Sequence, residues 1–144
     1  MPTIVPDSTV LVSAFLAPHG AADRVLDAAM ANQVQLAVSA AILAETRRVL
    51  LTYRRLRQRY TYTDDEVEGF YALLGQAFIL LTAFPPVSGV CRDPNDDMVL
   101  ACAVAASAQY LVTRDKDLLV LQQYQGIMIV TPEAFLTWLR STLP

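Results

Sequence analysis

The chain has 144 residues, of which 54% are hydrophobic and 17% charged, and its formal net charge is −3. This length fits one domain spanning residues 1–144, and the acidic balance argues against a general nucleic-acid binder with a basic surface. No apolar stretch reaches the roughly 18 residues that a membrane span needs, and the N-terminus lacks a basic start, so we expect a cytoplasmic protein without membrane contact.

Strands and helices are expected to alternate along the whole chain. The hydrophobic patterns predict strands over residues 3–6, 34–38, 77–82, 110–112 and 127–130, and helices over residues 8–16, 21–31, 40–50, 64–76, 96–107 and 132–139. Such alternation predicts an α/β fold with a parallel sheet that helices cover on both faces.

The first predicted strand ends at a carboxylate, Asp7, and a helix begins directly after it. The free N–H groups and positive dipole end of that helix therefore lie beside the carboxylate, at the sheet edge where open α/β folds bind ligands. Glu45 lies about two turns into the helix that follows the second strand, and Ser39 caps this helix. Because both helices begin immediately after a strand, Asp7 and Glu45 can lie near the same edge.

A second group of acids begins the helix predicted over residues 96–107. Asp93 closes a turn, and Asp96 and Asp97 occupy the first helical turn. A helix dipole explains one or two acids there, but three within five residues exceed what capping requires. Their mutual repulsion suggests a divalent cation. The strand over 110–112 repeats the opening pattern, since Thr113 follows it and Asp115 and Asp117 come next.

Taken together, Asp7, Glu45, Asp97 and Asp115 form an all-oxygen set that favours Mg²⁺ or Mn²⁺ over zinc. The natural chemistry of such a site is metal-dependent phosphodiester hydrolysis. The single histidine, His19, is expected in a turn without a catalytic role. Cys91 and Cys102 match no metal-binding spacing, so we expect packed, reduced thiols.

Six of the eleven basic residues are arginines within one short stretch, close to several tyrosines. They are Arg47, Arg48, Arg54, Arg55, Arg57 and Arg59. Basic and aromatic residues mixed in this way suit a groove for single-stranded RNA. The alternative interpretation is an ordinary solvated helical face.

Several motifs resemble, in their order along the chain, those of the PIN-domain family. They are Asp7-x-x-Val-Leu-Val-Ser-Ala, Ile42-Leu43-x-Glu45, Arg92-Asp93-Pro94-x-Asp96-Asp97, Leu111-Val112-Thr113-x-Asp115-Lys116-Asp117-Leu118 and a terminal Ile-Val-Thr-Pro-Glu-x-Phe-Leu. The chain is most similar to the VapC-like branch, the toxin components of toxin–antitoxin systems. The match extends over almost the whole chain in order and spacing.

The resemblance implies a three-layer α/β/α sandwich with a parallel sheet of four to five strands. It also implies Mg²⁺- or Mn²⁺-dependent cleavage of single-stranded RNA, a homodimer, and a cognate antitoxin protein that covers the groove. Carried over by position, Asp7 and Asp97 are the principal metal ligands, Glu45 joins them directly or through water, and Asp115 is the fourth acid. The other candidate site residues are Asp117 as the alternative fourth acid, Asp93 and Asp96 as supports of the loop, and the hydroxyls of Ser8, Thr9 and Thr113.

The chain departs from the family after the first strand, where Asp-Thr-Asn is common and this sequence has Asp7-Ser8-Thr9. Ser8 can replace the threonine, but Thr9 lacks an amide for neighbouring carboxylates. Loss of such a contact typically weakens a metal site about 10–100-fold. A catalytically weakened module that binds RNA or an antitoxin is therefore the alternative to an active ribonuclease. A phosphohydrolase acting on small molecules is disfavoured, because it needs fewer basic contacts than six arginines offer.

Overall fold

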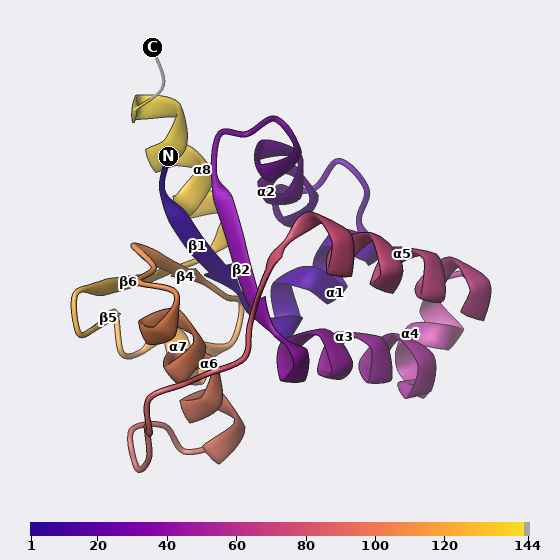
Figure 1. The fold of residues 1–144 in the computed structure, drawn as a ribbon. Coiled ribbons are helices and arrows are strands. Elements are labelled where there is room, and N and C mark those ends of the chain that lie inside the picture. Colours follow the sequence, from indigo (N-terminus) through magenta and orange to yellow (C-terminus); the bar gives the residue numbers. More distant parts are fainter. Residues whose placement is uncertain (143–144) are drawn as a thin grey trace.

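The computed structural model describes residues 1–142, and strands and helices alternate along it (Figure 1). Residues 143 and 144 of the expected domain lie outside the described part. The strands are β1 (Thr3–Pro6), β2 (Gln35–Ser39), β3 (Ile79–Leu81), β4 (Tyr110–Val112), β5 (Gln123–Tyr124) and β6 (Ile127–Val130). The helices are α1 (Ser8–Leu16), α2 (Ala21–Met30), α3 (Ala40–Thr52), α4 (Arg54–Arg59), α5 (Asp64–Ala77), α6 (Pro94–Ala105), α7 (Lys116–Leu119) and α8 (Pro132–Thr142).

The strands form one sheet in the order β3-β2-β1-β4-β6-β5. All neighbouring pairs are parallel except β5 and β6, which are antiparallel. The expected parallel sheet is confirmed, and β5 is an addition. Gln125 and Gly126 join β5 to β6 with φ values of 48° and 81°, the left-handed conformation that a two-residue hairpin requires. Gln-Gly is a weaker hairpin signal than Asn-Gly, which explains why the sequence pattern did not predict this strand.

The order in which the chain adds strands reverses between the parallel neighbours β1 and β4. From β1 the chain adds β2 and β3 on one side, and from β4 it adds β6 on the other side. The carboxyl ends of β1 and β4 therefore border the crevice where open α/β sheets bind ligands. The backbone N–H of Asp7 donates to the carbonyl of Val112 at 3.1 Å, which holds the two strand ends together.

Helices cover both faces of the sheet, as expected for an α/β/α sandwich (Figure 1). Leu100 of α6 packs in the cluster that contains Val5, whereas Phe135 of α8 packs in the cluster that contains the neighbouring Ile4. Successive residues of β1 thus point to opposite faces, and both side chains are fully buried. This explains why the strands are continuous apolar runs rather than alternating ones.

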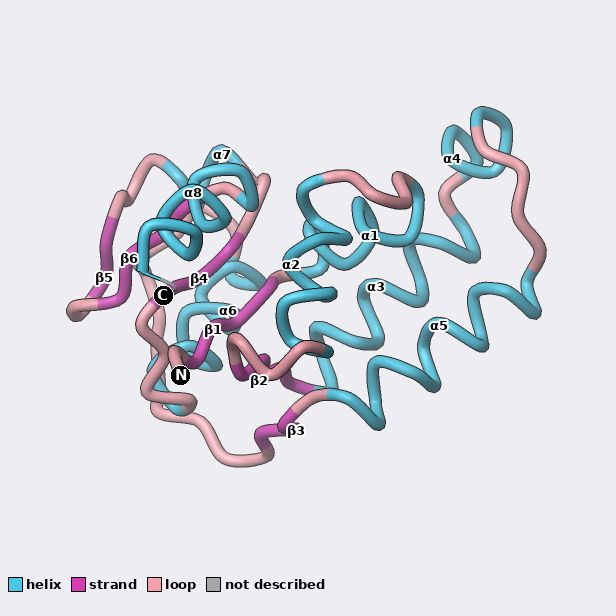
Figure 2. Tube along the Cα trace, turned by 90° about the horizontal axis from the view of Figure 1, so that it is seen from above, coloured by secondary structure: helices cyan, strands magenta, loops and turns pink. Residues whose placement is uncertain are grey.

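Helices α3, α4 and α5 form an arm that extends away from the sheet (Figure 2). The chain bends at Tyr53 between α3 and α4, and two side chains satisfy the free carbonyl of Leu50 there. The hydroxyl of Tyr62 donates to it at 2.7 Å and the guanidinium of Arg57 at 3.3 Å. Within residues 1–142, every helix is too short or too polar to cross a membrane.

Candidate active site

An acidic pocket opens at the carboxyl ends of β1, β2 and β4, with a volume of about 490 Å³. Its acidic lining residues are Asp7, Glu45, Asp93, Asp96 and Asp115. These side chains come from four separate segments of the chain and meet because parallel strands end at one edge of the sheet. The structure therefore brings together Asp7, Glu45 and Asp115, which the sequence predicted to share that edge. Ser8 and Thr9 also line the pocket.

Asp7 forms the floor of this pocket, and only 3% of its surface is exposed. Its carboxylate accepts hydrogen bonds from the hydroxyls of Thr9 and Thr113 and from the N–H of Val10. Burial raises the pKa of Asp7, the three hydrogen bonds oppose that rise, and the nearby charge of Asp115 adds to it. A negative charge at Asp7 is therefore only partly compensated by its protein neighbours.

Two threonine hydroxyls connect Asp7 to the loop that follows β4. Thr9 Oγ1 donates to Asp7 Oδ1 at 2.6 Å and accepts from the backbone N–H of Arg114 at 2.9 Å. Thr113 Oγ1 donates to Asp7 Oδ2 at 2.5 Å and accepts from the N–H of Asp115 at 2.9 Å. The expectation that Thr9 leaves the carboxylates without a supporting contact is thus corrected, because its hydroxyl donates directly to Asp7.

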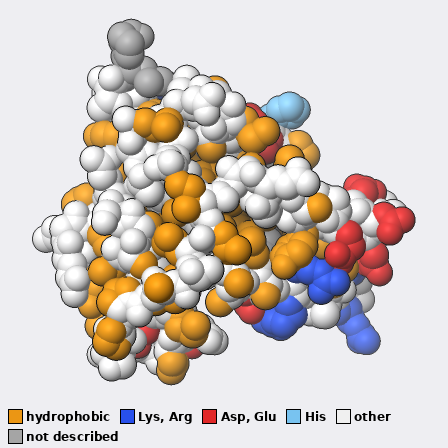
Figure 3. All heavy atoms as spheres, viewed as in Figure 1, with side chains coloured by type: hydrophobic (Ala, Val, Ile, Leu, Met, Phe, Trp, Pro, Cys, Tyr) orange, Lys and Arg blue, Asp and Glu red, His pale blue; other side chains and the backbone are white. Residues whose placement is uncertain are grey.

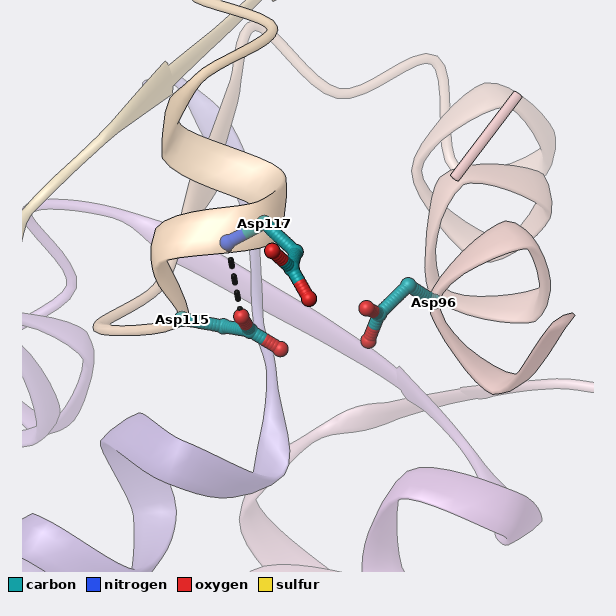
Figure 4. A group of neighbouring side chains, drawn as sticks. All are labelled: Asp96, Asp115 and Asp117. Atoms are coloured by element: carbon teal, nitrogen blue, oxygen red, sulfur yellow. Dashed lines mark hydrogen bonds between the residues drawn. The ribbon is translucent and has the colours of Figure 1, made fainter. Parts of the chain in front are cut away.

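Asp96, Asp115 and Asp117 form a cluster in which one carboxylate oxygen from each lies within 4.8 Å of the others. Figure 4 shows the three side chains pointing toward one another, Asp96 from α6 and the other two from the start of α7. Asp115 caps α7 by accepting from the N–H of Asp117 at 2.9 Å. Burial and then the charges of Asp115, Asp93 and Asp7 raise the pKa of Asp96 to about 7. Half-buried, crowded carboxylates of this kind could hold a divalent metal ion.

The structure does not bring Asp97 into this cluster. Only 4% of Asp97 is exposed, and its two oxygens accept from the backbone N–H groups of Gly89 at 3.1 Å and Cys91 at 2.8 Å. Consecutive helical residues point about 100° apart, so Asp96 and Asp97 have different surroundings. Asp96, which was expected only to support the loop, lines the pocket, whereas Asp97, which was expected as a principal ligand, accepts from these two backbone N–H groups instead.

Glu45 lines the pocket but already has a cationic partner. Arg48 binds its carboxylate through two nitrogens, Nε at 3.1 Å and Nη2 at 2.7 Å. The same guanidinium lies over the ring of Tyr53, with 5.6 Å between its central carbon and the ring centroid. Arg48 is thus part of the pocket wall and neutralises part of its charge.

Three of the six arginines in the arginine stretch, Arg47, Arg48 and Arg57, form ion pairs with acidic side chains. Arg47 binds Glu68 at 2.7 Å, and Arg57 binds Asp64 at 2.8 Å while it also donates to the carbonyl of Leu50. Within the arginine stretch of residues 47–59, the arginines that make no ion pair with any of residues 1–142 are the exposed Arg54, Arg55 and Arg59 of α4. Figure 3 shows basic side chains gathered over the arm, beside the acidic start of α5.

A comparison with known families matches residues 3–117 to the PIN domain. The matched segment runs from β1 into α7 and contains every acid of the pocket and of the cluster. It ends before β5, β6 and α8. A comparison with curated proteins gave no match.

Proposed function

The chain belongs to the PIN-domain family, whose members are typically nucleases, and from this premise we propose that it is a metal-dependent endoribonuclease that cleaves single-stranded RNA. The observation that carries the proposal is the cluster of Asp96, Asp115 and Asp117 beside the buried Asp7. A metal-dependent nuclease needs concentrated negative charge of this kind to hold a cation against the phosphate backbone.

The donor set suits Mg²⁺ or Mn²⁺, because it consists of carboxylate oxygens and contains neither histidine nor thiolate. We propose that Asp96, Asp115 and Asp117 hold the ion and that Asp7 lies within its reach. Bound there, the ion would activate water and stabilise charge on the phosphorus oxygens. Thr9 and Thr113 orient the Asp7 carboxylate by donating to its two oxygens.

Glu45 and Asp97 take different parts in this proposal. Glu45 remains a possible additional ligand, directly or through water, for which the ion competes with Arg48. Asp97, predicted from the sequence as a principal ligand, is proposed instead to anchor residues 89–91, since backbone N–H groups occupy both of its oxygens.

The RNA-binding surface that we propose is α4 together with its neighbouring tyrosines. Arg54, Arg55 and Arg59 are exposed and make no ion pair among residues 1–142. Guanidinium groups free of acidic partners can bind phosphates, and exposed aromatic rings can stack on bases. A small-molecule substrate bound in the pocket would not reach the arginines of α4, which do not line the pocket. This surface therefore favours a polymeric substrate.

We also propose that the protein is the toxin of a toxin–antitoxin pair, that it acts as a homodimer, and that an antitoxin covers its acidic pocket. The support is the motif resemblance to the VapC-like branch and the exposure of Leu73, Ile79 and Leu80, which are 48%, 42% and 50% exposed. Light scattering of the purified protein tests the dimer. The expected mass is twice the 15.8 kDa of one chain, and a monomer at all concentrations contradicts it.

The weakened, non-cleaving module had its main support in Thr9, and the hydrogen bond from Thr9 to Asp7 removes that support. The deciding experiment incubates purified protein with a labelled single-stranded RNA and with its fully paired duplex, in Mn²⁺ or Mg²⁺. We expect cleavage of the single strand alone, abolished by EDTA and by Asp7→Asn. Metal-dependent RNA binding without cleavage would contradict the proposal.

A further inference from the structure

Arg114 tethers the acidic loop after β4 to two helices, α1 and α8. Its Nε donates to Ser13 Oγ of α1 at 3.2 Å. Its two terminal nitrogens donate to the two carboxylate oxygens of Glu133, in the first turn of α8, at 2.9 Å each. Its backbone N–H donates to Thr9 Oγ1. These four hydrogen bonds of Arg114 therefore hold the loop after β4 against α1 and α8.

The residues on either side of Arg114 point the other way, into the acidic site. Thr113 donates to the carboxylate of Asp7, and Asp115 belongs to the cluster with Asp96. A rotation of the loop about Arg114 would therefore move Thr113 and Asp115 together. The paired hydrogen bonds between Arg114 and Glu133 resist such a rotation, because a planar guanidinium joined at two points has a fixed orientation.

The exposure of this ion pair argues for a geometric role rather than a large contribution to stability. The side chains of Arg114 and Glu133 are 37% and 55% exposed. Exposed ion pairs stabilise proteins little, because solvent screens the charges. The hydrogen bonds from Arg114 nevertheless favour the charged form of Glu133 and lower its pKa, which extends the pair to more acidic pH.

We propose that Arg114 and Glu133 are a positioning pair that holds Asp115, and with it Asp117, in the geometry required to bind the metal ion. This inference rests on the proposed function. Through Glu133, the helix α8 would take part in organising the site, although it lies outside the segment that matches the family. Neither side chain needs to touch the ion or the RNA for this role.

The experiment compares full-length wild type with Glu133→Gln, Glu133→Ala, Arg114→Ala and the double variant Arg114→Ala/Glu133→Ala. The first readout is the Mn²⁺ dissociation constant, measured from the electron paramagnetic resonance of free Mn²⁺. We expect Glu133→Ala and Arg114→Ala each to weaken Mn²⁺ binding about tenfold, the lower end of what losing an outer support of a metal ligand does. The double variant should be no weaker than the single ones, because each single change already breaks the pair.

The second readout is the kinetics of RNA cleavage. A positioning role predicts a lower kcat with an unchanged KM, and Glu133→Gln should lie between wild type and Glu133→Ala. Arg140→Gln is the matched control, since it removes a charge from α8 at a residue that makes no ion pair within residues 1–142. It should bind Mn²⁺ as the wild type does.

Three results would overturn the inference. Variants that lose thermal stability but bind Mn²⁺ normally would show a merely structural contact. A raised KM with an unchanged kcat would make Arg114 an RNA contact, and a wild type that binds no Mn²⁺ would leave no site to position. Wild type that binds Mn²⁺ but cleaves no RNA would refute the proposed function alone, because the comparison of Mn²⁺ affinities still decides the role of the pair.

Discussion

Asp96 and Asp97 are neighbours of identical chemistry that the fold uses in opposite ways. The carboxylate of Asp96 faces three other acids, and this crowding together with burial raises its pKa to about 7. The carboxylate of Asp97 faces two backbone N–H groups that would otherwise lack partners. Asp96 therefore adds uncompensated negative charge to the pocket, whereas Asp97 holds the backbone of residues 89–91 in place.

Asparagine at each of these positions should separate the two roles. We expect Asp96→Asn to weaken Mn²⁺ binding at least about tenfold, since it removes a direct donor, and to leave the free energy of unfolding of the metal-free protein unchanged or higher. Asp97→Asn should lower that free energy by about 1 kcal/mol, because the amide offers one acceptor to two part-buried donors. Urea unfolding and Mn²⁺ titration measure both effects, and the reverse pattern would restore Asp97 as the ligand.

The hydroxyl of Thr9 provides a second test at the scale of single residues. Thr9→Val keeps the shape of the side chain but removes both the hydrogen bond to Asp7 and the acceptor for Arg114 N–H. We expect cleavage to slow about tenfold or more, as is typical when a support of a metal ligand is lost. Thr9→Ser, which keeps the hydroxyl, is the control. Equal rates for valine and serine would show that the contact is unimportant.

At the scale of elements, α8 is joined to the β4–α7 loop by a pair that depends on pH. The pKa of Glu133 is lower in the folded protein than its ordinary value, chiefly because Arg114 donates to it. Its stabilising effect is therefore complete above the ordinary glutamate pKa and is lost as the pH falls through the folded pKa.

The lowered pKa of Glu133 predicts how Glu133→Gln changes thermal stability with pH. The variant should have a lower thermal midpoint than the wild type at pH 7, and the difference should shrink as the pH falls below the ordinary glutamate pKa. Calorimetry of both proteins between pH 7 and strongly acidic pH measures the difference. A gap that widens on acidification would contradict the assigned pKa direction.

The arginines of the arm formed by α3, α4 and α5 have different roles. Arg57 holds the bend between α3 and α5 through Leu50 and Asp64, whereas Arg54, Arg55 and Arg59 have no such task. Replacing those three with alanine should weaken single-stranded RNA binding and reduce the salt slope by about 2, since each phosphate contact on a single strand contributes roughly 0.7.

Fluorescence anisotropy across a series of salt concentrations measures that slope. Arg57→Ala is a useful comparison, because we expect it to lower stability more than it changes the slope. If the triple variant retains the wild-type slope, α4 is an ordinary solvated face and RNA binds elsewhere.

At the scale of the whole molecule, the sheet order decides where the acids meet. Asp7 and Thr113 are far apart in the sequence, but the parallel pairing of β1 with β4 makes them neighbours. The folded chain therefore assembles an acidic site that the unfolded chain does not have. A ligand that binds only the folded state stabilises it by mass action.

Metal addition should therefore raise the thermal midpoint. Mn²⁺ at 100 times its dissociation constant contributes about 2.7 kcal/mol, which corresponds to a rise on the order of 10 °C for a chain of this size. EDTA should reverse the shift, and Asp96→Asn should reduce it strongly. Differential scanning fluorimetry measures the midpoints, and an equal shift in both proteins would place the ion outside the cluster.

The local features of the chain could be predicted from its sequence because they depend on spacing over a few residues. The strand before Asp7, the cap at Ser39 and the acidic start of α5 all follow from periodicity and helix-end chemistry. The alternation of strands and helices predicted the parallel sheet covered on both faces, since such an alternation has few ways to pack, and the family resemblance implied the three-layer sandwich.

Tertiary structure decided how side chains with equivalent local patterns are used. Among residues 1–142 it placed Asp96 rather than Asp97 in the pocket lining, paired Arg57 with Asp64 but gave Arg54 no ion pair, and joined Arg114 to Glu133. None of these outcomes follows from spacing, because a side chain's direction and partner depend on segments that only the fold brings together. The sequence alone thus determined which acids and arginines the protein has for its chemistry, and contacts between distant segments determined which of them face the site.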